Sequence, residues 1–239
     1  IEISTKPILL KNFVSFIRSI NSRPELFFLE RFIKKGYLIA DLNFNFDEFG
    51  TIKKDYQING LLKEGEIHTL KKNKIENINF IFDIEENNFN FRDISFDTNN
   101  INLLSDRLSI KKDKKDYFLE GSLRNKESTL NDQLLKVIKF KYPQFNLINT
   151  KFESKNDFSF NTNNKFKVKN LAINSTILIN NAQLKKNNLI NKNFIEINEL
   201  IDLKDHEIKA SYSNQKLSID GKGQIKLQNK FELIDYKVK

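Results

Sequence analysis

The sequence contains no cysteine, no methionine and no tryptophan, and its 239 residues include only two histidines, seven glycines and three prolines. The absence of cysteine excludes disulfides, thiolate chemistry and cysteine-ligated zinc. It does not decide the compartment, because such a chain suits an oxidising envelope and a reducing cytosol equally. No run of 18 or more apolar residues occurs, so we expect no segment to span a bilayer as a helix.

Motifs that carry catalysis or nucleotide binding are also missing. The sequence has no GxGxxG, no Walker loop, no GxSxG and no HExxH. His68 and His206 lack cysteines or a carboxylate cluster at ligand spacing, and we interpret both as surface residues on polar strand faces. Glu85 and Glu86 are interpreted as a solvated turn, and Gly221-Lys222-Gly223 as a bulge or bend within a strand. The sequence therefore predicts no enzyme, no metal site and no cofactor.

Charge of one sign is not concentrated anywhere. Forty Lys and Arg residues against 31 Asp and Glu give a formal net charge of +9, but the acidic residues are distributed along the whole chain and few of the cations are arginines. A nucleic-acid site normally gathers its cations on one face and favours arginine, so nucleic acid is an unlikely partner. The charged segment Lys111–Asp116 is interpreted as a solvated hairpin tip that protects a sheet edge, with contact to phosphates or lipid headgroups as the alternative.

Helical periodicity is confined to three stretches. Apolar residues from Ile8 to Ile20 follow i, i+3, i+4 spacing, and a second helix is predicted from Glu25 to about Lys35, ending at Gly36. These two helices form a predicted helical hairpin over residues 1–36. A third helix, predicted near residues 130–140, interrupts the pattern that follows.

From residue 37 to residue 239 the apolar residues recur with a period of two, interrupted by turns rich in Asn, Lys and Asp. A phase change near Arg92-Asp93 predicts a β-bulge. The predicted fold is mainly β: an elongated antiparallel β-meander that forms a curved, taco-like groove, together with the helical hairpin and one interrupting helix.

This alternation gives nearly every strand one face of Phe, Ile or Leu and one polar face. Burying each large apolar side chain gains roughly 1.5–3 kcal/mol, so the apolar face requires a cover, which is a second sheet, the helices, a membrane or a lipid chain. The residues predicted to line a lipid-binding groove are Leu42, Phe44, Phe46, Ile78, Phe80, Phe82, Ile84, Phe89, Phe91, Leu217, Ile219, Ile225 and Leu227.

Two other architectures remain open. A closed β-sandwich would bury the same positions in a dry core and act as a structural or interaction module. The scarcity of Gly and Pro, and a strand pattern that ends without closure, favour the groove and suggest a fragment of a longer chain. An outer-membrane barrel is less favoured, because Trp is absent and Phe rather than Tyr dominates.

Three segments, residues 41–53, 55–65 and 220–227, carry a family resemblance. Their short strands and glycine-containing endings, such as Asp220-Gly221-Lys222-Gly223-Gln224-Ile225-Lys226-Leu227, resemble the AsmA-like proteins of Gram-negative envelopes, including the TamB and YhdP types. The resemblance covers most of residues 37–239. The chain departs from the family in being too short to bridge an envelope, in lacking a membrane anchor and in its opening helical hairpin.

The resemblance implies a segment of a bridge-like lipid transfer protein. Members of this family are periplasmic, are anchored to the inner membrane, and are implicated in phospholipid transport toward the outer membrane during its biogenesis. Applied to this chain, the implied partner is a phospholipid or another acyl-chain lipid, the implied location is the periplasm, and the anchor would lie in sequence outside residues 1–239. Only the inward apolar positions transfer from the family to this sequence, and none of them is catalytic.

Overall fold

The computed structural model describes residues 1–20, 27, 30–51, 53, 55–68, 74–114, 116–131, 147–163, 167–185, 200–227 and 230–238. The described elements are β1 (Glu2–Ser4), β2 (Ile8–Leu9), α1 (Leu10–Ile20), β3 (Ile33–Asn43), β4 (Gln57–His68), β5 (Lys74–Glu85), β6 (Asn88–Thr98), β7 (Ile101–Asp113), β8 (Asp116–Thr129), β9 (Leu147–Asn163), β10 (Val168–Lys185), β11 (Leu200–Ser213), β12 (Lys216–Leu227) and β13 (Lys230–Val238).

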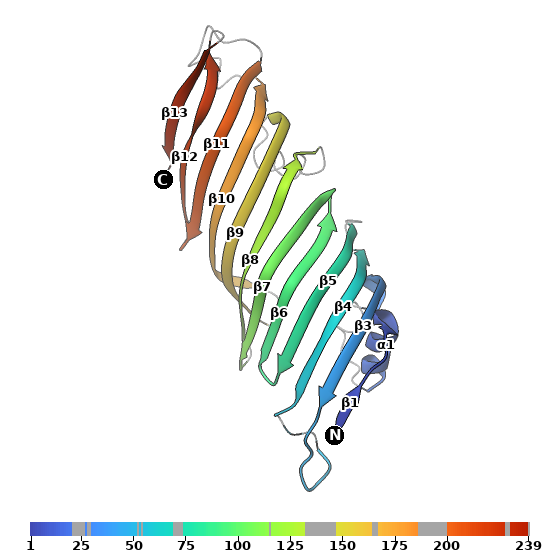
Figure 1. The fold of residues 1–239 in the computed structure, drawn as a ribbon. Coiled ribbons are helices and arrows are strands. Elements are labelled where there is room, and N and C mark those ends of the chain that lie inside the picture. Colours follow the sequence, from blue (N-terminus) through green and yellow to red (C-terminus); the bar gives the residue numbers. More distant parts are fainter. Residues whose placement is uncertain are drawn as a thin grey trace. The chain divides into compact units, whose positions relative to one another are not determined.

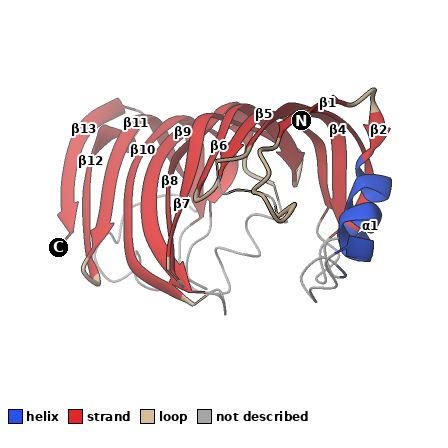
Figure 2. Ribbon diagram, turned by 90° about the horizontal axis from the view of Figure 1, so that it is seen from below, coloured by secondary structure: helices blue, strands red, loops and turns tan. Residues whose placement is uncertain are grey.

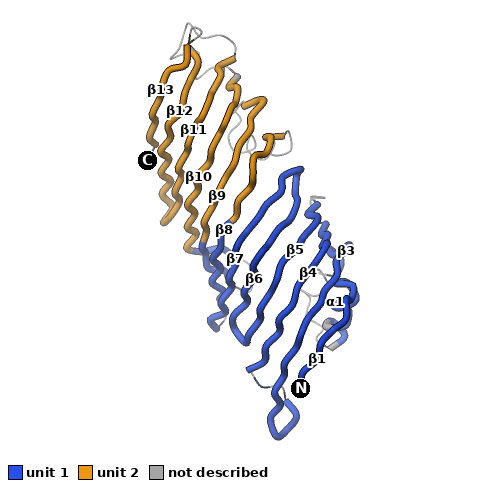
Figure 3. Tube along the Cα trace, in the orientation of Figure 1, with its two compact units in different colours: residues 1–122, 159–169 blue, residues 123–158, 170–239 orange. Residues whose placement is uncertain are grey.

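Each strand from β3 to β13 pairs with the next strand in the chain, which gives a 13-stranded antiparallel meander with β1 at one end and β2 paired beside it on β3 (Figure 1). The prediction of a mainly β antiparallel meander is therefore confirmed. The chain divides into two compact units: unit 1 comprises Ile1–Ser122 and Ser159–Lys169, and unit 2 comprises Leu123–Phe158 and Asn170–Lys239 (Figure 3).

The N-terminal segment differs in part from the prediction. Helix α1 matches the first predicted helix, but two short strands precede it, and Glu30–Phe32 are the last helical residues before β3 begins at Ile33. The second helix was thus predicted to end too late. Ile33 is only 2% exposed and pairs with Ile67 of β4, so tertiary burial outweighs the helical periodicity of the local sequence. Residues 21–26 and the predicted third helix from residue 132 onward lie outside the described residues.

In unit 1 the apolar side chains form rows across the strands, because the register places them directly opposite one another. One row consists of Leu42, Ile58, Ile84, Phe89 and Ile110, and the next consists of Ala40, Gly60, Phe82, Phe91 and Leu108. The buried core of this face is Leu38, Ala40, Leu62, Ile78 and Phe82. Phe80 makes edge-to-face contacts with Phe82 and Phe91, with ring centroids 6.2 and 5.4 Å apart.

Helix α1 packs at the β3 end of this apolar face (Figure 2). Leu10 and Phe13 contact the buried cluster, and Val14 is itself only 5% exposed. The helix therefore uses one apolar stripe to cover the first strands of unit 1.

Several strands contain a β-bulge at a residue with a positive φ angle. Glu64, Asn77, Asp93 and Asp205 have φ values of 54°, 50°, 50° and 50°, and each lies where the register shifts between neighbouring strands. Each bulge adds one residue, so apolar residues on both sides of it keep the same face. The bulge at Asp93 confirms the phase change predicted at Arg92-Asp93.

Unit 2 repeats the row arrangement on β10 to β13. One row is Ile177, Ile208, Gly221 and Tyr236, the next is Ser175, Ala210, Ile219 and Val238, and a third is Ala182, Leu203, Ile225 and Glu232. Leu147, Ile179 and Ala182 form the buried cluster of this unit, with Leu203 and Ile208 packed against it. The apolar rows of unit 2 thus cross its last four strands, with Ser175 and Glu232 as polar ends.

Candidate functional site

The apolar face of unit 1 contains most of the residues predicted to line a groove. Leu42, Ile78, Phe80, Phe82, Ile84 and Phe91 belong to the core cluster or pack against it, and Phe89 joins their row through pairing with Ile84 and Ile110. Only Ile78 and Phe82 are buried, whereas the other five keep an intermediate exposure. The face is therefore apolar and in register but incompletely covered by the protein.

Phe44 and Phe46 lie beyond the end of β3, which ends at Asn43. The Asp47 carboxylate accepts hydrogen bonds from the backbone N–H groups of Phe49 and Thr51, at 2.9 and 2.8 Å, and so turns the chain immediately after the strand. Phe44 lies 6.5 Å from the ring of Tyr56, and Phe46 is 40% exposed. The strand prediction extended three residues too far at this point.

In unit 2, the predicted residues Ile219 and Ile225 lie within the apolar rows, and both are half-buried. Leu217 pairs with Tyr212 near the end of the sheet and is 44% exposed. The side chain of Leu227 lies outside the described part of the structure. The sequence pattern thus located the correct face of β12.

His206 corrects the interpretation that both histidines are surface residues. It is 4% exposed, pairs with Ile179 of β10, and lies on the apolar face. The bulge at Asp205 is the cause, since it places Leu203, His206 and Ile208 on one face. His68, in contrast, has a side chain 43% exposed and contacts Glu66 Oε1 at 2.7 Å.

Two glycines of β12 provide space for two rings on this face. A Cβ atom at Gly221 would lie 2.1 Å from Cζ of Tyr236, and a Cβ atom at Gly223 would lie 2.4 Å from Cγ of His206. The two rings are 6.2 Å apart. Gly221 and Gly223 therefore leave room for the rings of Tyr236 and His206. The bulge predicted for this segment lies instead on the neighbouring strand, at Asp205.

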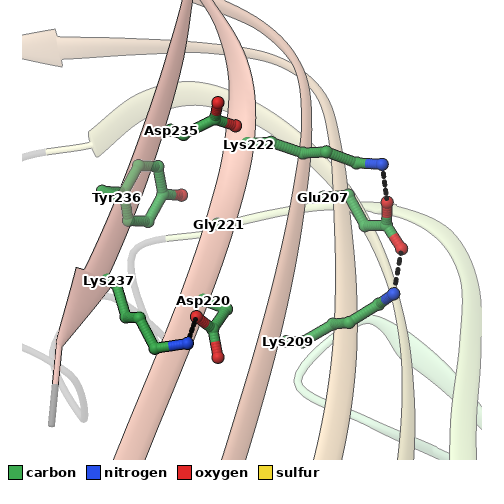
Figure 4. A pocket seen from close by; sticks show the side chains of 8 residues that line it. All are labelled: Glu207, Lys209, Asp220, Gly221, Lys222, Asp235, Tyr236 and Lys237. Carbon is green, nitrogen blue, oxygen red and sulfur yellow. Dashed lines mark ion pairs between the residues drawn. The ribbon is translucent and has the colours of Figure 1, made fainter.

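A hollow of about 430 Å³ lies on β11, β12 and β13 (Figure 4). It is lined by Gly221, Tyr236 and six charged residues: Glu207, Lys209, Asp220, Lys222, Asp235 and Lys237. Glu207 accepts from Lys222 at 3.0 Å and from Lys209 at 3.2 Å, and these bonds, with that of Lys222 first, lower the pKa of its carboxyl. Lys237 pairs with Asp220 at 2.9 Å. Because three cations are matched by three anions, the hollow offers no net charge to a ligand.

The described residues contain no group of three or more His, Cys, Asp or Glu that could hold a metal ion. Among the described helices, none is long and apolar enough to cross a membrane. The most distinctive feature of the described structure is therefore the half-covered apolar face in each unit, with His206 and Tyr236 as polar groups on that of unit 2. Both were missed as site residues, although Leu203 and Ile208 lie an odd number of positions apart and so signal the phase change.

Comparison of this chain with protein-family models, with curated proteins and with solved structures finds no significant match.

Proposed function

We propose that this chain is a segment of a bridge-like lipid transfer protein of the AsmA-like type, and that the apolar face of each unit carries phospholipid acyl chains. The observation that carries the proposal is the set of apolar rows that are in register but only half-buried. Rows of Phe, Ile and Leu left partly open to water need an apolar cover, and an acyl chain supplies one at roughly 0.8 kcal/mol per buried CH₂. The lipid headgroup would remain in water, and no bond would be made or broken.

The closed β-sandwich, acting as a structural or interaction module, is the alternative. All described strands belong to a single hydrogen-bonded sheet, so the described residues provide no separate second sheet to cover the apolar rows. This observation favours a lipid over a dry protein core. A periplasmic location, with an inner-membrane anchor in sequence outside this segment, belongs to the same proposal.

Site-specific photo-crosslinking tests the proposal face by face. The crosslinker p-benzoylphenylalanine is introduced at Phe91 in unit 1 or at Ile219 in unit 2, and the protein is illuminated in Gram-negative cells. The matched controls are Asn90 and Ser218, which are the preceding residues in the same strands and project to the opposite face. We expect lipid adducts, detected by mass spectrometry, at Phe91 and Ile219 but not at the controls. Equal labelling of both faces, or no lipid adduct at any position, would contradict the proposal.

A further inference from the structure

On the apolar face of unit 2, His206 presents one polar atom that has no partner among the described residues. Its Nε2 lies 3.0 Å from the backbone oxygen of Gln224, and since a carbonyl can only accept, Nε2 carries the proton. In the neutral ring Nδ1 is then an acceptor, and within the described part of the chain it has no hydrogen-bond donor. A polar atom in a residue only 4% exposed is costly to leave unmatched.

Tyr236, which is half-buried, presents a second polar atom on this face. Its ring lies across Gly221, and its hydroxyl has no hydrogen-bond partner among the described residues. A phenol is protonated at neutral pH and burial raises its pKa further, so the hydroxyl is available as a donor. With the ring centroids of His206 and Tyr236 6.2 Å apart, one small group can reach both.

Both rings have apolar neighbours in the cross-strand rows, while Tyr236 also lines the charged hollow described above. In the cross-strand rows, His206 is flanked by Ile179, and Tyr236 lies in the row of Ile177 and Ile208. A ligand for this place therefore needs a hydrocarbon chain together with a group that donates one hydrogen bond to Nδ1 and accepts one from the Tyr236 hydroxyl.

We infer that His206 and Tyr236 bind the carboxyl group of a free fatty acid, whose chain lies along the apolar face of unit 2. This inference rests on the proposed function, because it requires that face to hold acyl chains. The acid O–H donates to Nδ1 of His206 and the acid C=O accepts from the hydroxyl of Tyr236. If the proton moves to Nδ1, the resulting carboxylate accepts from both side chains, so the pair serves either protonation state.

The same geometry discriminates against esters. An ester oxygen can accept from Tyr236, but an ester has no O–H to donate, so Nδ1 of His206 stays unmatched when an esterified chain binds. Leaving a buried polar atom unpaired costs about 1–3 kcal/mol, which corresponds to roughly a tenfold loss of affinity or more.

Calorimetric titration of the whole chain with oleic acid and with methyl oleate tests this inference. We expect the acid to bind at least about tenfold more tightly than the ester. His206→Leu should bring the two affinities close together by weakening the acid alone, because only the acid donates to Nδ1. Tyr236→Phe removes a donor that both ligands use, so it should weaken both of them and keep the preference for the acid. The matched controls are Tyr212→Phe, a phenol on the same face of β11, and His68→Leu, the other histidine, which should leave both affinities unchanged. His206→Leu also removes the bond to Gln224. If that variant does not fold, Tyr236→Phe, which removes a single oxygen atom, decides the result by whether it weakens both ligands.

The outcomes separate the inference from the function on which it rests. If both ligands bind wild-type protein equally, if the preference for the acid survives in folded His206→Leu, or if Tyr236→Phe weakens neither ligand, the carboxyl site is wrong while acyl binding stands. If neither ligand binds, the proposed function itself is wrong.

Discussion

At the scale of single residues, three glycines determine how closely the strands and rings of the apolar faces approach. The atoms nearest to a Cβ at Gly221 or Gly223 of β12 belong to the side chains of Tyr236 and His206, whereas a Cβ at Gly60 of β4 would lie 2.3 Å from the backbone oxygen of Ile39. A side chain can move away, but a backbone carbonyl held in a sheet cannot. The two kinds of glycine should therefore respond differently to substitution.

Gly223→Ala is expected to lower the free energy of unfolding by about 1–3 kcal/mol, because the added methyl group overlaps the imidazole of His206. In the double variant with His206→Ala this overlap is gone, so the two changes should couple by about 1 kcal/mol or more. Gly60→Ala combined with Phe82→Ala is the comparison, where no relief is expected because the Ile39 carbonyl stays in place. Urea unfolding of the single and double variants measures both double-mutant cycles. Additive effects at Gly223 and His206 would show that the His206 ring does not pack against Gly223.

The carboxyl of Glu66 has a strongly lowered pKa. It contacts His68 at 2.7 Å, Lys35 at 3.1 Å and Lys74 at 3.5 Å, and its side chain is 10% exposed. The hydrogen bond from His68, followed by that from Lys35, lowers the pKa of Glu66 from 4.5 to about 2. Because the folded-state pKa is below the unfolded value, the stabilisation is present above pH 4.5 and is lost as the pH falls toward 2.

Glu66→Gln should therefore lower stability at neutral pH by about 1–3 kcal/mol, and the difference from wild type should shrink as the pH falls from about 5 to 2. The matched control is Glu85→Gln, an exposed residue at the end of β5 with no ion pair among the described residues. Thermal unfolding across this pH range measures the difference. A difference that is independent of pH would contradict the stabilising role of the Glu66 carboxylate.

At this scale the sequence predicted well on which face of the sheet the apolar side chains lie, and predicted it poorly for the polar ones. Periodicity placed Phe82, Phe91 and Ile219 on the apolar face, because strand geometry alone fixes which side alternate residues take. It placed His206 on the wrong face, because one extra residue at Asp205 reverses the phase. Tyr236 was missed, because its ring packs over Gly221 of the neighbouring strand. The register that pairs these two residues cannot be inferred from the sequence of one strand.

At the scale of elements, the bulges keep each strand's apolar residues on one face along its whole length. The bulge of β11 holds Asp205 at a φ of 50°, in the left-handed region that Asn and Asp tolerate and β-branched residues avoid. Asp205 is well exposed, and its contact with Lys204 is long at 3.9 Å, so its side chain contributes little by itself. Its backbone conformation is what the strand requires.

Asp205→Val should therefore destabilise the protein by about 1–2 kcal/mol, whereas Asp205→Asn should be nearly neutral. Ser211→Val is the matched control, since Ser211 is an exposed residue in the regular part of the same strand, where a β-branched residue is favourable. Denaturant midpoints report the difference. Equal costs at positions 205 and 211 would contradict the account of the bulge.

The elements also show where local sequence was insufficient. The bulge at Asp93 was predicted, because Phe91 and Ile94 change phase within a strongly apolar pattern. The early start of β3 at Ile33 was not predicted, because Ile33 fits the periodicity of the preceding helix and only its pairing with Ile67 makes it a strand residue. Similarly, β3 ends early because the Asp47 carboxylate forms a tight turn that competes with strand alternation.

At the scale of the whole molecule, the two ends of the described sheet differ. At one end β1 has three residues and α1 packs on β3, which leaves little backbone free for pairing. At the other end β13 is a nine-residue strand without proline, and its Leu233 is 83% exposed. Short strands and covering helices are how proteins protect sheet edges, so only the β1 end shows that protection.

The central claim at this scale is that the apolar face is covered by lipid. Net charge, length and the absence of catalytic motifs reduced the number of candidate functions. They did not distinguish a lipid-binding groove from a structural module, because the same alternating pattern also suits a dry protein core. The described single sheet favours lipid, and the number of half-covered apolar rows makes binding of more than one acyl chain the natural expectation.

The most direct measurement is native mass spectrometry of the chain purified from Gram-negative cells without detergent, followed by lipid extraction of the same sample. The account predicts that phospholipid co-purifies with the protein and is released on denaturation. It further predicts that Ile219→Asp depletes this lipid while Ser218→Asp, on the opposite face of the same strand, does not. A folded, monodisperse wild-type protein free of lipid would contradict the account.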